Sequence, residues 1–374
     1  MPTEIELLKA LVAIPSVSGT EEATARFLED TARRAGLEAI RDDASVTMTV
    51  DSGRPGPSLA FISHLDVVPP GEGWTRDPFT PIVEGERLYG RGSGDAKASV
   101  AAMTLAAADL RGRLGRGRLL VIMGYGEETR HTTMGTAVSR AGPIDAAVVG
   151  EPTNLNAAVA QRGLLMADLI ARGDQRHAGY AGDDGPFTNA ITALALDLVR
   201  LDGLVGERTH PILGPTTVTP TMLTAGVSRN VTPPAAKAVL DIRSTPAWPH
   251  DELARALKER LHGEVVITSD RLVPCETPAV SRLLEAARRA RPSLTTFGSP
   301  TCSDWSSCAI PTPSSAGRGP AVGRTRRTST SIFPRSPRRG RSTARWRRSI
   351  WHETADKADR AGSNIVGERS NARP

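Results

Sequence analysis

Three short apolar runs in the first half of this 374-residue chain constrain its fold more than any other feature. The runs span residues 58–62, 118–123 and 146–149, and each has the composition of a strand that is buried on both faces. Strands of this kind occur in sheets that are covered by helices. Each run ends in acidic or imidazole side chains, and open α/β sheets bind their ligands at the carboxyl ends of the strands. We therefore expect an α/β fold with one functional site at this edge of its sheet.

The side chains at the three strand ends have the chemistry of a metal site. Each run is followed directly by such groups: His64 and Asp66, then Glu127 and Glu128, and finally Glu151. Carboxylates that gather in one place repel one another unless a cation lies among them. One imidazole with several carboxylates suits zinc, or cobalt or manganese, better than calcium. Taken alone, each group is more often part of a solvated turn, but their recurrence at three strand ends favours a metal centre.

A glycine-rich loop at residues 90–94 leads into Asp95 and an alanine-rich helix that extends to about Leu110. The loop lacks the Lys-Ser/Thr ending of a phosphate-binding loop, and its spacing is not that of a dinucleotide-binding loop. From the residues alone, Asp95 is the N-cap of this helix. Nearer the N-terminus, residues 18–20 precede two glutamates and indicate the N-cap of a helix that ends before Gly36.

After Arg162 the pattern changes to a series of short strands and helices. Strands are expected at 164–171, 217–223, 235–243 and 264–268, and helices at 189–201 and 250–262. This is the make-up of a small α+β unit with an antiparallel sheet. The predicted fold is therefore an α/β protein of two domains. Residues 1–161 plus 272–305 form a mixed sheet flanked by helices, and residues 162–271 form an inserted α+β domain.

Composition excludes several classes of protein. The chain has no apolar run long enough to cross a membrane, its N-terminus lacks the pattern of a signal peptide, and its three cysteines show no disulfide framework. These features predict a cytoplasmic protein. The net charge of +6 arises from residues 306–374, which carry 15 Lys and Arg against 4 Asp and Glu, so that residues 1–305 have a net charge of −5. A basic segment of this kind is either a disordered tail or a nucleic-acid-binding arm.

Together the ordered motifs resemble the M20 family of zinc amidohydrolases, which includes acetylornithine deacetylase, succinyl-diaminopimelate desuccinylase and carboxypeptidase G-like enzymes. The resemblance covers residues 3–305 and rests on motifs taken in order: Ser63–Asp66, Gly90–Asp95, Glu127–Glu128, Gly150–Pro152, His177, and Asn230 followed by Asp241 and Arg243. It implies a two-domain α/β metallohydrolase fold, in which the inserted domain acts as a lid and as a dimerisation domain.

The resemblance also implies a set of metal ligands. His64, Asp95 and Glu151 would hold one zinc ion, and Asp95 would bridge to a second zinc ion that Glu128 also binds. Cobalt or manganese could take the place of zinc. Two metal ions about 3.5–4 Å apart can together bridge and acidify a water molecule.

The remaining candidates receive catalytic and binding roles by the same resemblance. Asp66 would orient His64, and Glu127 would be the general base. His177, on the lid, would stabilise the oxyanion, often from the partner subunit of a homodimer. Arg229 and Asn230 would bind the carboxylate of the substrate.

Two segments, 150–153 and 298–305, are most similar to the acetylornithine and acetylcitrulline deacetylase branch. The predicted reaction is hydrolysis of the amide bond of an N-acyl amino acid, with acetylornithine, acetylcitrulline or acetyl-lysine as substrate and arginine biosynthesis as the pathway. A dipeptidase or carboxypeptidase acting through the same metal ions is the alternative. The expected partners are a small N-acyl amino acid or peptide and a second copy of the chain, not nucleic acid or a membrane.

The chain departs from the family after Trp305. The family's last ligand, a histidine in a Ser-His-Thr context, is absent, and residues 306–374 have the composition of a disordered tail. Codons for residues 323–331 can be chosen so that a shifted frame encodes Ser-His-Thr-Pro-Asp-Glu-His-Ile, the expected ligand motif. We therefore predict that one nucleotide is missing just after the Trp305 codon. The chain as written would then lack one ligand of the second zinc ion and the closing elements of its catalytic domain. It would be unstable and weakly active, or an inactive pseudoenzyme.

Overall fold

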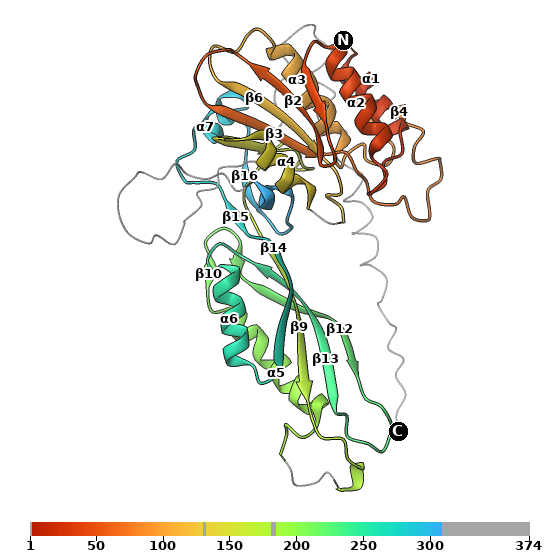
Figure 1. Cartoon of the computed structure of the whole chain (residues 1–374), viewed down its shortest axis with the longest axis vertical. Helices are drawn as coiled ribbons and strands as arrows, with labels where there is room; N and C mark the ends of the chain where they lie inside the picture. Colours follow the sequence, from red (N-terminus) through yellow and green to blue (C-terminus); the bar gives the residue numbers. More distant parts are fainter. Residues whose placement is uncertain (1, 130–131, 181–184, 309–374) are drawn as a thin grey trace, which may run out of the picture.

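The structure is a computed structural model that describes residues 2–129, 132–180 and 185–308 (Figure 1). Its first sheet has five strands in the order β1-β2-β6-β3-β7, with bounds β1 Glu38–Arg41, β2 Ser45–Asp51, β3 Ser58–His64, β6 Arg118–Gly124 and β7 Ala146–Val149. The three apolar runs form β3, β6 and β7, which are adjacent and parallel, whereas β2 runs antiparallel to β6. Ile62 of β3 lies opposite Ile122 of β6 and Val149 of β7. The three carboxyl ends therefore meet at one edge of the sheet, and the predicted α/β fold with a mixed sheet is confirmed.

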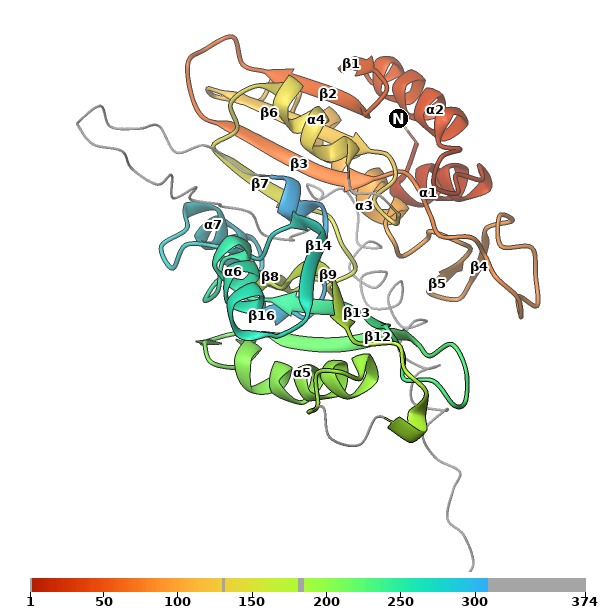
Figure 2. The ribbon, with the colours of Figure 1, turned by 60° about the horizontal axis from the view of Figure 1, so that its bottom comes forward.

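Helices cover both faces of this sheet (Figure 2). They are α1 Glu4–Ala13, α2 Glu22–Arg34 and α3 Lys97–Leu110 on one face and α4 Thr133–Ala141 on the other. Successive side chains of a strand point to opposite faces of the sheet. Phe61 and Val121 accordingly pack with the first three helices, and their neighbours Ile62 and Ile122 pack with α4. Burying one such side chain completely contributes about 1.5–3 kcal/mol to folding. The apolar clusters on the two faces of the sheet therefore hold β3, β6 and β7, and with them their carboxyl ends, in place.

The sequence determines both ends of α1. The Thr3 hydroxyl accepts a hydrogen bond from the backbone nitrogen of Glu6, whose carboxylate accepts one from the backbone nitrogen of Thr3. This capping box satisfies two backbone donors of the first turn. The helix ends before Pro15, because a proline disfavours the helical conformation in the residue that precedes it.

Two N-caps expected from the sequence are wrong. The helix predicted after residues 18–20 begins at Glu22, and no side chain caps it. The Ser18 hydroxyl is instead bonded to Asp66, 48 residues away. In α3 the N-cap position is taken by Ala96, again without a side-chain cap, and the side chain of Asp95 faces His64. Both polar side chains therefore contact the strand ends instead of the start of their own helix.

The second sheet is antiparallel and has the order β12-β13-β9-β14. Its elements are β9 Gly163–Arg172, α5 Ala190–Val205, β12 Thr217–Ala225, β13 Ala235–Ser244, α6 His250–Arg260 and β14 Glu264–Leu272. Along β9 buried and partly exposed residues alternate, as in a strand with one face on a core. Both helices pack on that face, and the buried side chains of this cluster all lie between Leu165 and Val265. The expected α+β insert with an antiparallel sheet is present, while the domain boundaries at 161/162 and 271/272 stay a prediction.

Several short elements were not predicted from the sequence. β8 (Ala157–Gln161) pairs in parallel with β16 (Thr296–Ser299) and antiparallel with β15 (Cys275–Glu276). Next to them lies α7 (Arg282–Ala290), for which the sequence does predict a helix, at 280–289. The others are β4 Ile82–Glu84, β5 Arg87–Tyr89, β10 Thr209–His210, β11 Gly214–Pro215 and the 3-10 turns η1 Ala178–Tyr180 and η2 Asp304–Ser307. None of the helices in the described ranges is long and apolar enough to cross a membrane.

The predicted tail begins at residue 306, but Ser306 and Cys308 are buried. Residues 309–374 lie outside the described residues. The predicted disorder of the tail and the predicted reading-frame shift after Trp305 fall on those residues and stay predictions.

Candidate metal centre

His64 is the last residue of β3 and is fully buried. Its Nδ1 lies 3.1 Å from the backbone oxygen of Asp66 and 3.3 Å from the Oδ1 atom of the same residue. Because a carbonyl and a carboxylate oxygen accept hydrogen bonds, Nδ1 carries the proton and donates it. The other nitrogen, Nε2, faces Oδ1 of Asp95 at 3.2 Å. Asp66 therefore fixes the ring so that Nε2 is the atom available to a metal ion.

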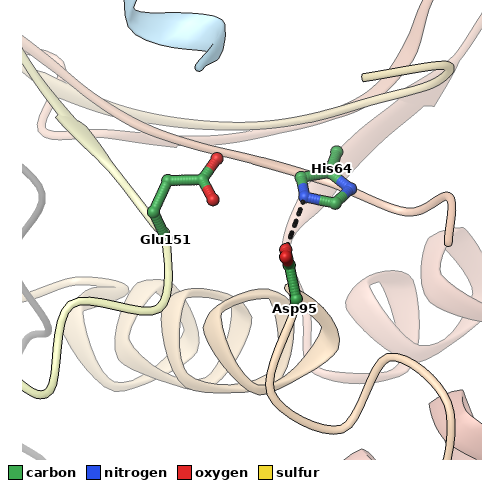
Figure 3. A group of neighbouring side chains, drawn as sticks. All are labelled: His64, Asp95 and Glu151. Atoms are coloured by element: carbon green, nitrogen blue, oxygen red, sulfur yellow. Dashed lines mark hydrogen bonds and ion pairs between the residues drawn. The ribbon is translucent and has the colours of Figure 1, made fainter. Parts of the chain in front are cut away.

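Three potential ligands converge at the carboxyl edge of the sheet (Figure 3). His64, Asp95 and Glu151 each offer one ligand atom, and these atoms all lie within 4.8 Å of one another. The Oε1 atom of Glu151 is buried, and none of the described residues forms a hydrogen bond with it. A buried polar atom without a partner is costly. Since imidazole nitrogens and carboxylate oxygens both ligate zinc in proteins, these residues fit a divalent metal ion.

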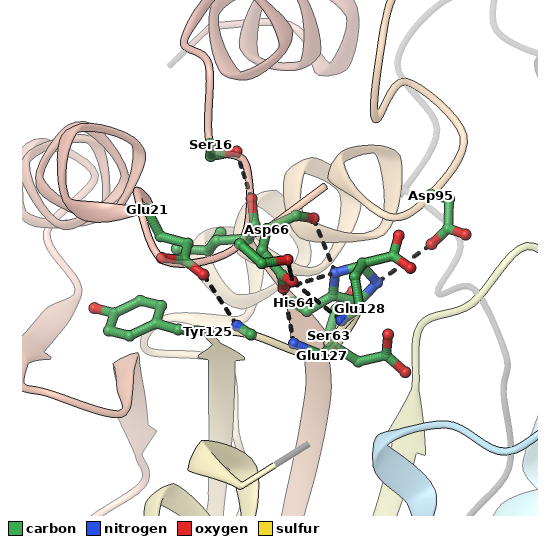
Figure 4. Close-up of polar contacts among 12 residues, drawn as sticks. Ser16, Glu21, Ser63, His64, Asp66, Asp95, Tyr125, Glu127 and Glu128 are labelled. Atoms are coloured by element: carbon green, nitrogen blue, oxygen red, sulfur yellow. Dashed lines mark hydrogen bonds and ion pairs between the residues drawn. The ribbon is translucent and has the colours of Figure 1, made fainter. Parts of the chain in front are cut away.

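Asp66 connects two of the strand ends (Figure 4). Its Oδ1 accepts a hydrogen bond from the backbone nitrogen of Glu127 at 3.0 Å. Its Oδ2 accepts one from the backbone nitrogen of Glu128 at 3.1 Å and one from the Ser18 hydroxyl at 2.7 Å. Burial raises the pKa of Asp66, but the His64 ring and these donors outweigh burial and lower the pKa overall. An ionised Asp66 thus orients the imidazole and also fixes the backbone of both glutamates.

Glu127 and Glu128 follow β6 and face a cavity of about 480 Å³. The described residues that line it are Asp95, Glu127, Glu128, Glu151, Pro152, Thr153, Ala158, Gln161, Phe297, Ser299, Pro300, Thr301, Cys302 and Ser303. Burial raises the pKa of Glu127, and the charge of Glu151 raises it further. The pKa of Glu128 and that of Glu151 rise for the same reasons, burial first and then the charge of Asp95 among their neighbours.

The His64 ring responds in the opposite sense. Burial lowers the pKa of its imidazole, but the hydrogen bonds to Asp66 and Asp95 and the charges of Glu151 and Glu127 raise it well above its ordinary value. The cluster therefore retains protons that separate side chains in water would release. Binding of a divalent cation requires their release, because a metal ion and a proton compete for the same atoms.

Asp304 is a buried carboxylate of this region that the sequence analysis missed. It is 2% exposed and begins η2, and its negative charge raises the pKa of Glu127 and that of Glu151. Burial also raises the pKa of Asp304 itself. The parallel pairing of β16 with β8 brings this segment to the cavity, and a hydrogen bond of 2.8 Å from Ser303 to Gln161 holds it there. The only signal in the sequence was an acidic residue in the motif at 298–305.

The structure does not bring the predicted lid residues to this group. His177 forms a β-bridge with Val231, and its Nδ1 accepts a hydrogen bond of 3.2 Å from the backbone of Gly179. Arg229 and Asn230 are exposed. None of the three predicted residues is among the described residues that line the cavity. Their roles, like those of the other predicted site residues, stay predictions.

Comparison with known proteins establishes the family. The sequence profile of peptidase family M20/M25/M40 matches residues 60–326. The chain belongs to this family. A succinyl-diaminopimelate desuccinylase from Methylorubrum extorquens is 32% identical over 333 residues, which cover 79% of this chain and 85% of the relative. The chain is therefore a metallohydrolase of the M20 family, in the class of amide and peptide hydrolases.

Solved structures share the fold at lower sequence identity. Aminopeptidase PepT from Bacillus cereus superimposes with a TM-score of 0.67 and 18% identity, covering 88% of this chain and 89% of that structure. A dinuclear metal-binding peptidase of the M20 family from Bacillus subtilis superimposes with a TM-score of 0.59 and 17% identity, covering 81% and 84%. These similarities confirm the metallohydrolase fold expected from the sequence.

Proposed function

We propose that this M20 protein hydrolyses the amide bond of an N-acyl amino acid with a metal ion held by His64, Asp95 and Glu151. The observation that carries the proposal is the convergence of their ligand atoms within 4.8 Å. The cavity is also lined by Asp95, Glu151 and Glu127. A ligand group and a candidate base therefore face one space that is large enough for a small substrate.

Glu127 is the proposed general base. It is 8% exposed, and its backbone is held by Asp66, so its carboxylate has a fixed position at the cavity. Burial and the charge of Glu151 raise its pKa to about 10 in the metal-free protein, so Glu127 is protonated at neutral pH. A divalent cation bound beside it would lower this pKa, and the ionised carboxylate could then accept a proton from water and return it to the leaving amine. A divalent ion bound at the centre would supply a Lewis acid that polarises the scissile carbonyl and acidifies the attacking water. Zinc, cobalt and manganese all suit the donor set.

Glu128 is the proposed ligand of a second metal ion, with Asp95 between the two. Glu128 lines the same cavity, and the charge of Asp95 contributes to raising its pKa, as expected of two carboxylates that face one space. The dinuclear metal binding named for the Bacillus subtilis relative supports two ions here.

For the substrate, we propose an N-acylated diamino acid. The relatives named succinyl-diaminopimelate desuccinylase favour a succinyl group, and the motif at 298–305 favours an acetyl group as in acetylornithine. Arg229 and Asn230 on the lid would bind the carboxylate of the amino acid, since a guanidinium pairs well with a carboxylate.

A homodimer would bring these lid residues to the cavity of the partner subunit, where His177 would stabilise the oxyanion. Strand β12 is an edge of its sheet, and Met222 and Leu223 on it are 64% and 60% exposed. On the adjacent α5, Val199 is 81% exposed. Exposed apolar edges of this kind mark interfaces between subunits. Light scattering on the Leu223→Arg variant tests this assignment: we expect a dimer for the unaltered protein and a monomer for the variant.

A second candidate is a chain that binds metal but hydrolyses poorly. It is favoured by one feature of the sequence: after His262 the only histidine is His352, which does not lie in a Ser-His-Thr context. Sequencing the gene across the Trp305 codon tests the frame shift that would account for this.

The experiment for the proposed function is a substrate panel. Release of free amine is measured for succinyl-diaminopimelate, acetylornithine, acetylcitrulline, acetyl-lysine and dipeptides, with and without zinc. We expect zinc-dependent hydrolysis of an N-acyl diamino acid by the protein whose frame is restored after Trp305, and slow hydrolysis by the 374-residue chain. Hydrolysis of dipeptides alone would contradict the substrate class, and no hydrolysis by either protein would contradict the proposed function.

A further inference from the structure

The segment Pro15–Glu21, here called the N-terminal loop, lies against the centre although it is distant in sequence. Its backbone forms two hydrogen bonds with Val67, the residue after Asp66: the nitrogen of Val67 donates to the Ser16 oxygen at 2.9 Å, and the nitrogen of Ser18 donates to the Val67 oxygen at 3.3 Å. The Ser16 hydroxyl also donates to the oxygen of Leu65 at 2.7 Å. These three hydrogen bonds align the N-terminal loop with residues 65–67.

Ser18 contacts the carboxylate on which the centre depends. Its hydroxyl donates to Oδ2 of Asp66 at 2.7 Å, a short bond to an ionised acceptor. The same Oδ2 accepts the backbone nitrogen of Glu128 at 3.1 Å. The serine hydroxyl therefore helps to fix the position of Oδ2, which in turn holds the backbone nitrogen of Glu128.

Glu21 contacts the neighbouring turn. Its side chain is 7% exposed, and its Oε1 accepts the backbone nitrogen of Gly126 at 3.1 Å and that of Gly19 at 3.0 Å (Figure 4). Gly126 has a φ of +65°, a conformation that is costly for residues other than glycine. Glu21 thereby links the N-terminal loop to the turn at residues 126–128, which carries Glu127.

From these contacts we propose that Ser18 and Glu21 are positioning residues, which set the Asp66 carboxylate and the turn 126–128 for metal binding and catalysis. Ser18 and Glu21 are not among the described residues that line the cavity. The inference rests on the proposed function, since it assigns Glu127 and Glu128 the roles of base and ligand. It also explains why the polar segment 18–21 does not cap α2 with a side chain.

Each position has a conservative and a disruptive variant. Ser18→Ala leaves Oδ2 of Asp66 without its hydroxyl donor, whereas Ser18→Thr keeps a hydroxyl. Glu21→Ala removes the acceptor of two backbone donors, whereas Glu21→Gln keeps an oxygen in the same place. Matched controls come from the same segment: Thr20, whose hydroxyl donates to Val17, and Glu22, which pairs with Arg26 and Arg41. Thr20→Ala and Glu22→Ala lose interactions of similar kinds that do not reach the centre.

The first readout is amide hydrogen exchange in the metal-free protein. We expect the loss of one hydrogen bond to accelerate amide exchange about tenfold. The affected amides should be those of residues 127 and 128 in Ser18→Ala and that of residue 126 in Glu21→Ala. The second readout is zinc affinity by competition with a chelator, which we expect to fall about 10–100-fold in both variants, as for other partners of metal ligands. In the frame-restored protein, kcat should fall with little change in KM. Ser18→Thr and Glu21→Gln should recover most of each loss, and both controls should match the unaltered protein.

Two outcomes contradict different parts of the account. If Ser18→Ala and Glu21→Ala match Thr20→Ala and Glu22→Ala in exchange and in zinc affinity, the positioning role is wrong while the proposed function stands. If the unaltered protein binds no zinc, the proposed function fails, and the catalytic part of this inference fails with it.

Discussion

Asp66→Asn perturbs the centre with almost no change of shape. The carboxylate accepts four hydrogen bonds, two at each oxygen, so an amide in its place must turn its nitrogen toward one pair of donors. Turned toward Oδ1, the nitrogen would oppose both the His64 ring and the Glu127 backbone. Turned toward Oδ2, it would oppose the Ser18 hydroxyl, which can rotate and accept, and the Glu128 backbone nitrogen, which cannot. The second orientation costs less, and it leaves the Glu128 nitrogen without an acceptor.

The magnitude follows from those contacts. An unsatisfied buried backbone donor costs about 1–3 kcal/mol, and each bond that changes from a charged to a neutral acceptor loses about 1 kcal/mol more. Part of this is recovered because a neutral amide is less costly to bury than a carboxylate. We expect the free energy of unfolding to fall by about 2–4 kcal/mol, which lowers the Tm of a 374-residue chain by roughly 3–5 °C. Zinc affinity should fall about 10–100-fold, since partners of a metal-bound histidine have effects of that size.

The assay is thermal unfolding of the metal-free protein together with a zinc competition titration. Asp66→Ala serves as the reference for complete loss, because it removes both acceptor oxygens and all four of their hydrogen bonds, and it should be affected more than Asp66→Asn. The reasoning would be refuted by an Asp66→Asn protein whose Tm lies within about 1 °C of the unaltered protein and whose zinc affinity is unchanged.

Two further predictions concern the same cluster, and a third concerns His177 on the lid. The pKa values of Glu127 and Glu151 are raised in the folded protein, so above the ordinary glutamate pKa of 4.5 the folded metal-free protein binds more protons than the unfolded chain. Its stability should therefore fall as the pH rises from 4.5 through neutrality. A melting temperature that rises with pH over this range in the presence of chelator would contradict the assignment. Zinc binding near pH 7 should release protons, because the ion displaces them from His64 and the carboxylates; calorimetry in buffers of different ionisation enthalpy measures their number, and a binding heat independent of buffer argues against the cluster. His177→Ala should lower kcat of the frame-restored protein about 10²–10³-fold at unchanged zinc content, as loss of an oxyanion donor does elsewhere, and an unchanged kcat would remove His177 from the mechanism.

The sequence predicted the strands that depend on local pattern and the acidic and imidazole side chains at their ends. β3, β6 and β7 are continuous apolar runs, and the rule that ligands bind at the carboxyl ends of parallel strands placed His64, Glu127 and Glu151 together. The helix α1 likewise begins with a capping box and ends just before a proline, and both signals lie within the local sequence. In these cases the information lies within a few residues of the feature.

The remaining features depend on contacts between distant residues. The bond from Ser18 to Asp66 spans 48 residues and that from Gly126 to Glu21 spans 105, so a local reading assigned the polar segment 18–21 to a helix cap. Asp304 reaches the centre only because β16 pairs with β8, and the four residues of β16 lack the continuous apolar run from which β7 was predicted. In both cases tertiary structure, not local propensity, decides where the side chain lies.

The central claim is that His64, Asp95 and Glu151 hold a metal ion in this M20 protein. The most direct test is the zinc content of the 374-residue chain after loading and dialysis, measured beside His64→Ala and Glu151→Ala, with His262→Ala as a control outside the group. We predict that the unaltered protein and His262→Ala retain zinc and that both ligand variants lose it. Equal retention of zinc by all four proteins, or by none of them, would contradict the claim.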